Sequence, residues 1–444
     1  MKSIRHILTL VLCTLSLCAW SQDYTRLSER TIMGTARYVG MGGAMTAVGG
    51  DPSAVFDNVA GLGLYRRSEI LVTFDETIDR TKQHETTNIG KRSYFMCPHA
   101  SLVFSLPTFK TVEKGVLFHN FMISYRRIHS YGRNYLATGT SDASLGALIT
   151  GADVDWDIAF CSDSYNNRNA LSLKEWGYVN EFSIDWAMNI SNQWYVGAGL
   201  RIQSTFHNAD AIFEETFDKF NTDGIVYSNT NSSALTLSGV TCSLSAGVIY
   251  RPAKWMRLGF GIHTPSIGTT RIYTNGKLKA VTDSLRYSYA PDAAGSDKDF
   301  HMPLHLSAST AFQIGAYGMI ALQYDYLKQH YNSGIHSLRA GIEVIPVMGM
   351  YINAGYVYES TFKSADVIVP MDPSFDRQDT YFQNLRWSQY ASCAVGYRGT
   401  HMIIQAAYQY RWQRLNLYAH EAAKPYDIHT DTHRIVLTIG WHRY

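Results

Sequence analysis

Histidine and cysteine are the residue types in this sequence most able to bind a metal or carry out catalysis, but their spacing forms no familiar site. His301 and His305 lie four residues apart, yet Pro303 between them is incompatible with the helix that would make them a ligand pair. No HExxH sequence occurs. The cysteines beyond residue 21 form no CxxC pair. We therefore expect no metal, no cofactor and no enzymatic activity.

A glycine-rich stretch from Gly40 to Gly43 is the next candidate for chemistry, because such loops can bind nucleotide phosphates. A dinucleotide-binding loop needs the full GxGxxG spacing directly after a strand and before a helix. This stretch lacks both the spacing and a preceding strand pattern. We therefore do not predict a nucleotide site.

Polar residues, some of them charged, alternate with apolar residues in several segments. From Glu181 to Ile190 the even positions are all apolar, while the odd positions include Glu181 and Asp185. After a predicted turn at 191–193 the alternation resumes at Trp194, with Arg201 on the polar face. The packed core of a β-sandwich could not bury such charges without a large desolvation cost. The pattern predicts a barrel with a polar interior and an apolar exterior.

The same alternation recurs along the chain in segments long enough to cross a bilayer when tilted. No segment beyond residue 21 has 18 apolar residues in a row, so we predict no transmembrane helix. The fold class predicted is all-β: a transmembrane antiparallel β-barrel of about fourteen strands. The strands are expected near 68–79, 93–105, 117–131, 178–190, 194–206, 236–250, 255–265, 302–314, 318–329, 335–346, 349–358, 387–398, 401–415 and 433–443.

The connections support a bacterial outer-membrane barrel, because short turns alternate with long polar segments. The short turns are 191–193, 251–254, 315–317, 347–348 and 399–400. The long segments are 132–177, 207–235, 266–301, 359–386 and 416–432.

The N-terminus predicts secretion. Lys2 and Arg5 precede an apolar run that ends at Trp20, and Ala19 and Ser21 are small residues suited to cleavage. We expect residues 1–21 to be a signal peptide and residues 67–444 to form the barrel. Loss of Lys2 and Arg5 leaves 37 basic residues against 37 acidic ones, which gives no reason to expect a nucleic-acid partner.

Residues 22–66 do not show strand alternation and are rich in glycine and alanine. Arg37 to Val48 could hold a short helix, weakened by its glycines. We predict that residues 22–66 form a plug, or hatch, in the barrel lumen, because apolar residues such as Val55, Phe56 and Leu62 are poorly suited to a free tail. The alternative is a periplasmic tail.

Two regions of the chain, one near the N-terminus and one in the middle, resemble the FadL/TodX-type outer-membrane transporters of hydrophobic compounds. Residues 36–44 and 49–55 resemble the hatch of that family, and residues 58–65 resemble its Asn-Pro-Ala-Gly motif. Residues 250–265 resemble the turn between two central strands of the family. The resemblance covers nearly the whole mature chain. It assigns the hatch motif to Gly42, Gly43, Asn58, Ala60 and Gly61.

One position departs from the family pattern. Val59 stands where the family usually has proline, which would stiffen the turn. Whether the hatch moves as it does in relatives is therefore left open.

The resemblance implies passive uptake of long-chain fatty acids, aromatic hydrocarbons or similar cargo. Cargo would pass from a groove in the outer loops into the plugged lumen and leave through a gap in the barrel wall. An apolar path of this kind keeps such a solute out of water. The partners implied are the hydrophobic cargo, outer-membrane lipid and lipopolysaccharide, whose phosphates Arg126 and Arg127 could contact.

Residues 208–220 are the candidate groove. They read as an amphipathic helix with Ile212, Phe213, Phe217 and Phe220 on one side. The same side chains could instead only hold the loop against the barrel mouth.

Arg201 and Arg339 lie on predicted inward faces, where a cation could bind a carboxylate cargo. Asp185, Asp325 and Glu343 are predicted to face inward too. Structural ion pairs across the lumen are therefore the favoured role of both arginines.

Three other functions remain as alternatives at this point. They are a general porin, a docking barrel of a secretion or surface-assembly system, and an outer-membrane enzyme with its site in the loops. The sequence leaves open the cargo, the direction of transport, the position of a lateral gap and the oligomeric state.

Overall fold

The computed structural model describes residues 30–84, 89–108, 114–141, 167–217, 228–281, 286–290, 293–299, 303–328, 334–360, 381–419 and 423–443. Most of these residues lie in one antiparallel sheet. Its strands are β1 (Ser68–Gln83), β2 (Ile89–Pro107), β3 (Val116–Ser141), β4 (Asn167–Ile190), β5 (Trp194–Phe217), β6 (Ser228–Ala253), β7 (Met256–His263), β8 (Ile267–Val281), β9 (Arg286–Tyr289), β10 (Ala294–Asp299), β11 (His305–Ile314), β12 (Gly318–Leu327), β13 (Ile335–Val344), β14 (Met350–Ser360), β15 (Phe382–Arg398), β16 (Met402–Tyr418) and β17 (Tyr426–Arg443).

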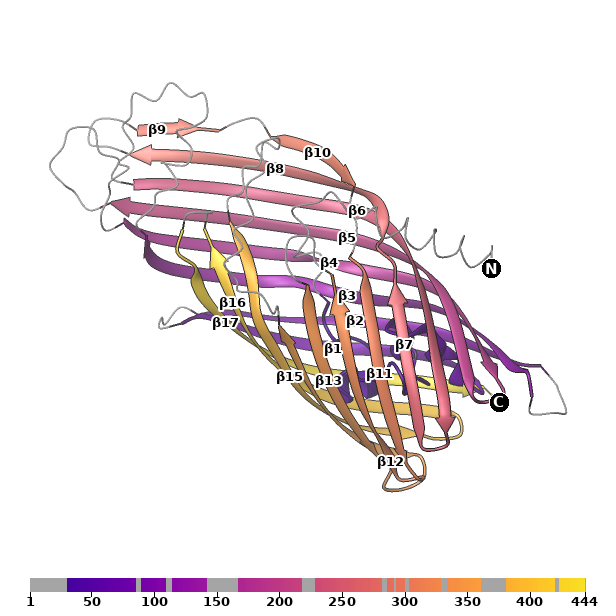
Figure 1. Cartoon of the computed structure of the whole chain (residues 1–444). Helices are drawn as coiled ribbons and strands as arrows, with labels where there is room; N and C mark the ends of the chain where they lie inside the picture. The colour runs from indigo at the N-terminus through magenta and orange to yellow at the C-terminus, as the bar shows by residue number, and fades with distance from the viewer. Residues whose placement is uncertain are drawn as a thin grey trace.

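The sheet closes on itself, because β1 pairs with both β2 and β17, and β7 pairs with both β6 and β11. β8 follows β7 along the same neighbour, β6. β10 pairs with β8 and precedes β11. β7 and β8 therefore together form one interrupted strand of the ring, and β10 and β11 together form another. The ring has fourteen antiparallel strands, as predicted, and Figure 1 shows the closed barrel.

All fourteen predicted strand positions hold strands, but several strands continue far into segments predicted as loops. β4 begins at Asn167, β5 runs to Phe217 and β6 begins at Ser228. Three further strands, β8, β9 and β10, lie within the segment 266–301. The predicted loops 132–177, 207–235 and 266–301 were therefore wrong over much of their length.

The regular alternation of polarity is lost in the upper part of β5, which is why this extension was missed. In the lower part the inward residues are polar, such as Arg201. In the upper part the buried inward positions hold both Phe213 and Glu215, and the exposed outward positions hold both Ile212 and Glu214. We call the end with turns such as 191–193 the short-turn end, and the opposite end the long-loop end.

The barrel wall is strongly asymmetric in height. β3 and β6 have 26 residues each, whereas β11 and β12 have 10 each. At roughly 3.3 Å per residue, the taller strands are about 50 Å longer. Figure 1 shows β3, β4, β5, β6 and β8 extending well beyond β11, β12 and β13 at the long-loop end. Among the described residues, no helix is long and apolar enough to cross a membrane.

Residues 30–67 precede the barrel and form α2 (Ala36–Gly40), η1 (Ala54–Phe56) and η2 (Val59–Leu64). The helix expected within 37–48 ends early, because Gly42 and Gly43 adopt positive φ angles of 61° and 70°. Nearly every residue from Ile32 to Gly63 is buried. α2 contacts β14 to β17 while η2 contacts β3 to β6, so the segment touches opposite walls of the barrel. Residues 1–29, which include the predicted signal peptide, lie outside the described part.

Candidate functional site

The N-terminal segment approaches the barrel wall at glycines that face inward. A Cβ atom added at Gly261 on β7 would lie 2.1 Å from the carbonyl oxygen of Asp57. At Gly247 on β6 it would lie 1.8 Å from Oδ1 of Asn58. Real Cβ atoms do not come so close to other atoms, so only glycine allows this approach. Glycines at these positions of the barrel strands therefore allow the N-terminal segment to pack directly against the wall.

The predicted hatch motif forms a compact turn. Asn58 Oδ1 accepts a hydrogen bond from the Ala60 amide at 3.0 Å, which caps η2. Asn58 Nδ2 donates to the carbonyls of Thr46 at 2.9 Å and Val248 at 3.2 Å, and so joins the turn to β6. Val59 is fully buried at the first position of η2. The turn thus forms with valine where the family has proline.

Buried ion pairs hold the segment to the wall. Arg37 makes a bidentate pair with Glu343 of β13, at 2.6 Å from Nε to Oε2 and 2.9 Å from Nη2 to Oε1. Arg339 Nη1 lies 3.2 Å from Asp57 Oδ2, and its Nε lies 2.9 Å from Asp325 Oδ2. The attraction between paired charges offsets part of the desolvation free energy that their burial costs.

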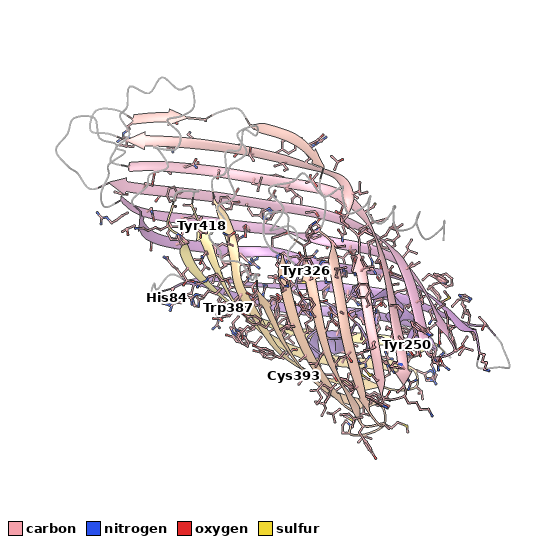
Figure 2. All side chains as sticks on the ribbon, in the orientation of Figure 1. His84, Tyr250, Tyr326, Trp387, Cys393 and Tyr418 are labelled. Carbon is pink, nitrogen blue, oxygen red and sulfur yellow. The ribbon has the colours of Figure 1, made fainter. Side chains whose placement is uncertain are left out.

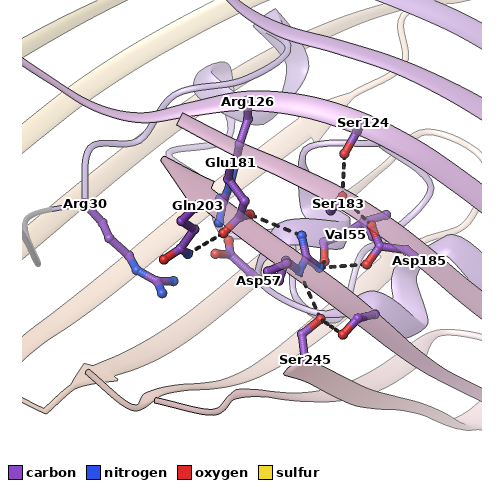
Figure 3. Close-up of polar contacts among 12 residues, drawn as sticks. Arg30, Val55, Asp57, Ser124, Arg126, Glu181, Ser183, Asp185, Gln203 and Ser245 are labelled. Carbon is purple, nitrogen blue, oxygen red and sulfur yellow. Dashed lines mark hydrogen bonds and ion pairs between the residues drawn. The ribbon is translucent and has the colours of Figure 1, made fainter. Parts of the chain in front are cut away.

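Arg201 is at the centre of a second polar network. Its Nη1 lies 3.3 Å from Glu181 Oε1 and its Nη2 lies 2.9 Å from Asp185 Oδ1. Arg201 Nη2 also donates to the carbonyl of Val55, which connects the network to the N-terminal segment. Figure 3 shows Glu181 between Arg126 and Gln203 in this network. Arg201 and Arg339 both make the ion pairs that their sequence positions favoured.

Among the described residues, Asp57, His305 and Asp325 form a group that resembles a metal-ligand arrangement, with ligand atoms within 4.8 Å of one another. Both carboxylates are already paired with Arg339. The Arg30 guanidinium lies 3.0 Å from Nδ1 of His305. With two guanidinium groups in place, the cluster is organised as an ion network. His301 lies outside the described residues.

Burial shifts the pKa values of charged groups in the N-terminal segment, including Arg30 and Asp51. Burial lowers the pKa of the Arg30 guanidinium to about 10. Burial raises the pKa of the Asp51 carboxyl above its ordinary value, although Arg37 and the hydroxyl of Thr35 oppose the shift. Asp51 therefore favours protonation more than an exposed aspartate does.

The wall has a discontinuity between β2 and β3. Their pairing begins at Pro107↔Phe118 and ends at His99↔Arg126. Both strands continue beyond that point, β2 to Ile89 and β3 to Ser141. The upper part of β2 pairs with β1 alone, with a register shift between Thr73 and Asp75, and the upper part of β3 pairs with β4. We call this interruption of the ladder the β2–β3 gap.

Pro98 stands at the point where the ladder ends. Proline has no amide hydrogen to donate, so in a sheet it is confined to edges, strand ends and bulges. Residues Cys97 and Pro98 fall where the β1–β2 register shifts. The local sequence therefore favours separation of β2 from its neighbour at this height.

The N-terminal segment contacts the unpaired edge of β3 just above the gap. The Thr31 amide donates to the carbonyl of Ile128 at 3.1 Å. The Thr31 hydroxyl lies 2.8 Å from Nδ1 of His129. These two contacts put residue 31 on the backbone that β2 leaves free.

Apolar residues line the inner face of the tall wall above this level. They form one buried cluster, which we call the outer apolar cluster. It draws residues from β3 to β6 and β8 on the tall wall, and from β16 and β17 on the opposite side. Members include Ile128, Tyr135, Leu173, Val179, Phe213, Leu237, Ile272, Leu417 and Tyr426.

The predicted groove helix at 208–220 was wrong, because residues 208–217 belong to β5. Strand alternation separates the residues that helical spacing would have brought together. Phe213 is 2% exposed in the outer apolar cluster, while Ile212 is 45% exposed on the outside. Phe217 ends β5, and Phe220 lies outside the described residues.

The outer surface of the barrel carries apolar and aromatic side chains. Trp194 and Tyr250 stack at 4.2 Å near the short-turn end, and Figure 2 labels Tyr250 there and Trp387 farther toward the long-loop end. Cys97, Cys242 and Cys393 are exposed and unpaired. Of the two arginines suggested as contacts for lipopolysaccharide phosphates, Arg126 is buried inside the barrel, whereas Arg127 lies over the Tyr178 ring.

Comparison with solved structures finds the same arrangement of strands. A Pseudomonas aeruginosa FadL homologue aligns with a TM-score of 0.59 at 12% identity, over 93% of this chain and 99% of that one. The CymD monoaromatic hydrocarbon channel aligns with a TM-score of 0.56 at 12% identity, over 94% and 99%. The P. putida toluene transporter TodX aligns with a TM-score of 0.52 at 13% identity, over 93% of this chain and 98% of that one.

The chain has the FadL-type fold. No family model matches its sequence, and no curated protein matches it significantly. At this level of identity the likeness establishes the fold alone, so what the FadL-type barrel does here must be argued from its own residues.

Sequence reasoning missed two features of this FadL-type barrel. The β2–β3 gap was not predicted, although a proline inside an otherwise regular strand is the signal that could have located it. The facing pair His99 and Arg126 was also missed, because only the register of β2 with β3 brings these residues together.

Proposed function

We propose that this protein is a bacterial outer-membrane channel for passive transport of hydrophobic small molecules, and not an enzyme. The observation that carries the proposal is the β2–β3 gap, where the wall loses its hydrogen-bonded ladder beside a buried N-terminal segment. A lateral opening of this kind suits apolar cargo, because the cargo can pass into lipid without entering water. Two of the matched structures, CymD and TodX, are a monoaromatic hydrocarbon channel and a toluene transporter, which supports the same function.

The outer surface supports placement in a membrane. Exposed residues on β4, β5 and β6 include Ile184, Leu200 and Leu244, all apolar, while the matching inward positions are polar. Lipid-facing and lumen-facing residues alternate in this way in transmembrane barrels. The polar outward face of upper β5 would then project beyond the bilayer, with lipopolysaccharide as its neighbour.

The N-terminal segment would act as the hatch of this channel. Its buried ion pairs with β13 and its backbone contacts at wall glycines favour a lumen closed to water and ions. Cargo would enter at the outer apolar cluster, which reaches from the long-loop end down to Ile128. Ile128 is also the residue that Thr31 contacts beside the β2–β3 gap.

The exit would open when residues 30–32 leave the edge of β3 beside the β2–β3 gap. The contacts of Thr31 with Ile128 and His129 join this part of the segment to that edge. Their loss would uncover the gap while the deeper hatch contacts at Arg37 stay in place. In this sequence of events the deeper part of the hatch keeps the lumen closed to water and ions, while movement of its N-terminal end opens the exit.

Uptake by cells tests the proposal. Cells lacking the gene and cells restored with it are compared for uptake of labelled dodecanoate and labelled toluene at equal outer-membrane integrity. Restored uptake of at least one compound supports the channel. Unchanged uptake of every lipophilic candidate would refute it. Steady ion conductance of the purified protein in planar bilayers would instead indicate a general porin.

A further inference from the structure

We propose that a basic patch on the outer face of four neighbouring strands binds a phosphate group of lipopolysaccharide. The patch consists of Arg80 and Lys82 on β1, Lys91 on β2, Arg414 on β16 and His429 on β17. This inference rests on the proposed placement in the bacterial outer membrane, but it does not depend on which cargo the channel carries. It concerns the surface that faces away from the lumen and the hatch.

Strand register brings the five side chains of the basic patch together. Arg80 faces Lys91 across the β1–β2 ladder. Lys82 faces His429 on β17, and His429 in turn faces Arg414 on β16. Directly opposite residues of an antiparallel pair project from the same face of the sheet, with Cβ atoms about 5 Å apart. The five residues therefore form two adjacent rows on one surface.

The side chains of the basic patch point away from the lumen. Arg80, Lys82 and Lys91 are exposed, whereas Thr81, which lies between two of them on β1, is buried inside the barrel. Because side chains on a strand alternate between the two faces, the basic residues of β1 must lie outside. They are therefore in reach of a lipid that surrounds the barrel.

The basic patch lies at the upper limit of the apolar outer surface. Trp441 of β17 faces Met402 of β16 near the short-turn end, and both are exposed. At about 3.3 Å per residue and a tilt of about 40°, the part of β16 from Met402 to Trp412 rises by about 25 Å along the barrel axis. That rise equals the height of the apolar band of outer-membrane barrels, whose limits are marked by aromatic residues. Arg414 is the next outward residue after Trp412, so it lies at the level of lipid head groups on the long-loop side.

Aromatic side chains flank this level. Trp387 of β15 faces Arg414 across the β15–β16 ladder, and the rings of Tyr410 and Trp412 stack at 5.3 Å. Aromatic rings with one polar atom are favoured where a membrane meets water. Figure 2 labels Trp387 and His84 on this side of the barrel. The aromatic residues therefore support the height assigned to the basic patch.

Nearby carboxylates leave the basic patch with an excess of positive charge. Asp427 accepts from Arg414 Nε at 2.8 Å. Asp431 faces Arg80 in register, but its Oδ1 accepts from the hydroxyl of Tyr410 at 2.8 Å.

Three cations of the basic patch have no protein partner in the described part of the chain. Arg80, Lys82 and Lys91 make no side-chain hydrogen bond or ion pair with another described residue. Their donors are therefore available to an anion from outside the protein.

The outward residues of β5, on another side of the barrel, have a different charge. There the exposed positions beyond the apolar run include Asp210 and Glu214. Lys174 of β4, also exposed, faces Asp210. Acidic residues repel phosphate, so a phosphate-bearing lipid is expected to prefer the side with the basic patch.

The chemistry of the basic patch matches a phosphate. Guanidinium and ammonium groups bind phosphate through charge-assisted hydrogen bonds. The outer leaflet of a bacterial outer membrane consists of lipopolysaccharide, which carries phosphates where its acyl chains meet its sugars. The long-loop end of the barrel faces that leaflet, and the basic patch lies at the same boundary. Lipopolysaccharide is therefore the occupant that fits both the charge and the position.

Lipid binding to the purified full protein in detergent tests the basic patch. Deep-rough lipopolysaccharide, the same lipopolysaccharide without its phosphates, and phosphatidylglycerol are each titrated, and bound lipid is counted by native mass spectrometry. The wild type is expected to bind the phosphorylated lipopolysaccharide at least about tenfold more tightly than the dephosphorylated form. Arg80→Gln, Lys82→Gln and Lys91→Gln should each weaken this binding about fivefold, and the triple variant about a hundredfold, because each removes one cation from the lipid surface.

Lys254→Gln is the matched control. Lys254 is an exposed lysine in the turn 251–254, at the opposite end of the apolar surface. Its replacement removes the same charge and is expected to leave lipopolysaccharide affinity unchanged. Arg80→Lys keeps the charge and should retain most of the affinity that Arg80→Gln loses. All of these positions are exposed, so the variants should pass the heat-modifiability test of barrel folding.

Several outcomes would overturn the inference. These are equal affinity for the two forms of lipopolysaccharide, wild-type affinity in the triple variant, or a Lys254→Gln effect as large as that of Lys82→Gln. Phosphatidylglycerol binding as tight as that of lipopolysaccharide would overturn the choice of lipid.

Failure of the proposed function looks different from failure of the basic patch. Cell fractionation that finds the wild type outside the outer membrane would refute the placement itself. Unchanged uptake of every lipophilic candidate would refute the channel, even if the purified protein binds lipopolysaccharide through the basic patch.

Discussion

Gly355 of β14 and Gly42 of the N-terminal segment are in backbone contact: a Cβ atom at position 355 would lie 2.2 Å from the amide nitrogen of Gly42. Gly42 itself has a φ of 61°, which side-chain-bearing residues rarely adopt. The hatch and the wall therefore meet through two residues that have no side chains.

Gly355→Val is expected to displace the hatch, because the added Cβ cannot be placed without moving the Gly42 backbone. Amide hydrogen exchange of residues 36–64 should accelerate, and ion leakage through the barrel in planar bilayers should rise. Ala354→Val is the matched control, since position 354 faces outward and is exposed. Equal protection of the hatch in both variants would contradict the close contact.

The Arg37–Glu343 pair gives a prediction about the cost of a lone buried charge. Arg37→Met and Glu343→Gln are each expected to destabilise the closed hatch by about 3–5 kcal/mol, because each leaves its partner charged and buried. The double variant should recover part of this loss. Hydrogen exchange of residues 36–64 measures the opening free energy in a double-mutant cycle.

Additive losses in that cycle would mean that the two residues act independently. Arg271 and Asp297 provide a comparison on the outer surface, where both partners are more than half exposed. Their replacement is expected to leave stability nearly unchanged, because exposed pairs are screened by water and salt.

Asp51 gives a prediction about pH. Thr35 Oγ1 and the Ser53 amide both donate to its Oδ1, at 2.7 and 2.9 Å, while its Oδ2 has no partner among the described residues. Because burial raises the pKa of Asp51, its protonated form is favoured in the closed hatch. This contribution is full at low pH and is lost as the pH rises through the raised pKa.

Asp51→Asn keeps the accepting oxygen and removes the titration. Hatch protection in wild type should therefore fall relative to Asp51→Asn as the pH rises, when both are followed by hydrogen exchange. Asp51→Ala loses both hydrogen bonds and should open more easily at every pH, by about 1–3 kcal/mol. A parallel pH response of wild type and Asp51→Asn would rule out titration of Asp51 as the cause.

Thr31 and His129 allow the proposed gate to be locked. With cysteines 97, 161, 242 and 393 replaced by serine, Thr31→Cys and His129→Cys can be joined by a short bis-thiosulfonate bridge, since their native side chains are in contact. The bridge is expected to abolish cargo uptake by cells, and reduction should restore it.

Each single cysteine variant, given the same reagent, should retain uptake. Full uptake by the bridged protein would show that residue 31 does not need to move, and would place the exit elsewhere in the wall.

The sequence alone determined the barrel. Alternation such as that from Phe182 to Ile190 is a local property, because neighbouring side chains on a strand point to opposite faces. The fourteen strand positions, the short turns and the inward ion-pair residues Arg201 and Arg339 all followed from it. The extension of β5 was missed because polar and apolar side chains occur on both faces of its upper part, so the alternation that marks its lower part is lost there.

Only the tertiary structure decided the pairing of distant residues. The end of the β2–β3 ladder, the contact of Gly355 with Gly42 and the facing of His99 with Arg126 depend on strand register and on where the N-terminal segment lies. A register is a relation between two chain segments, and a shift of one residue would turn every inward side chain outward. No single stretch of sequence holds that information, so the gap and its polar pair became visible only in the closed barrel.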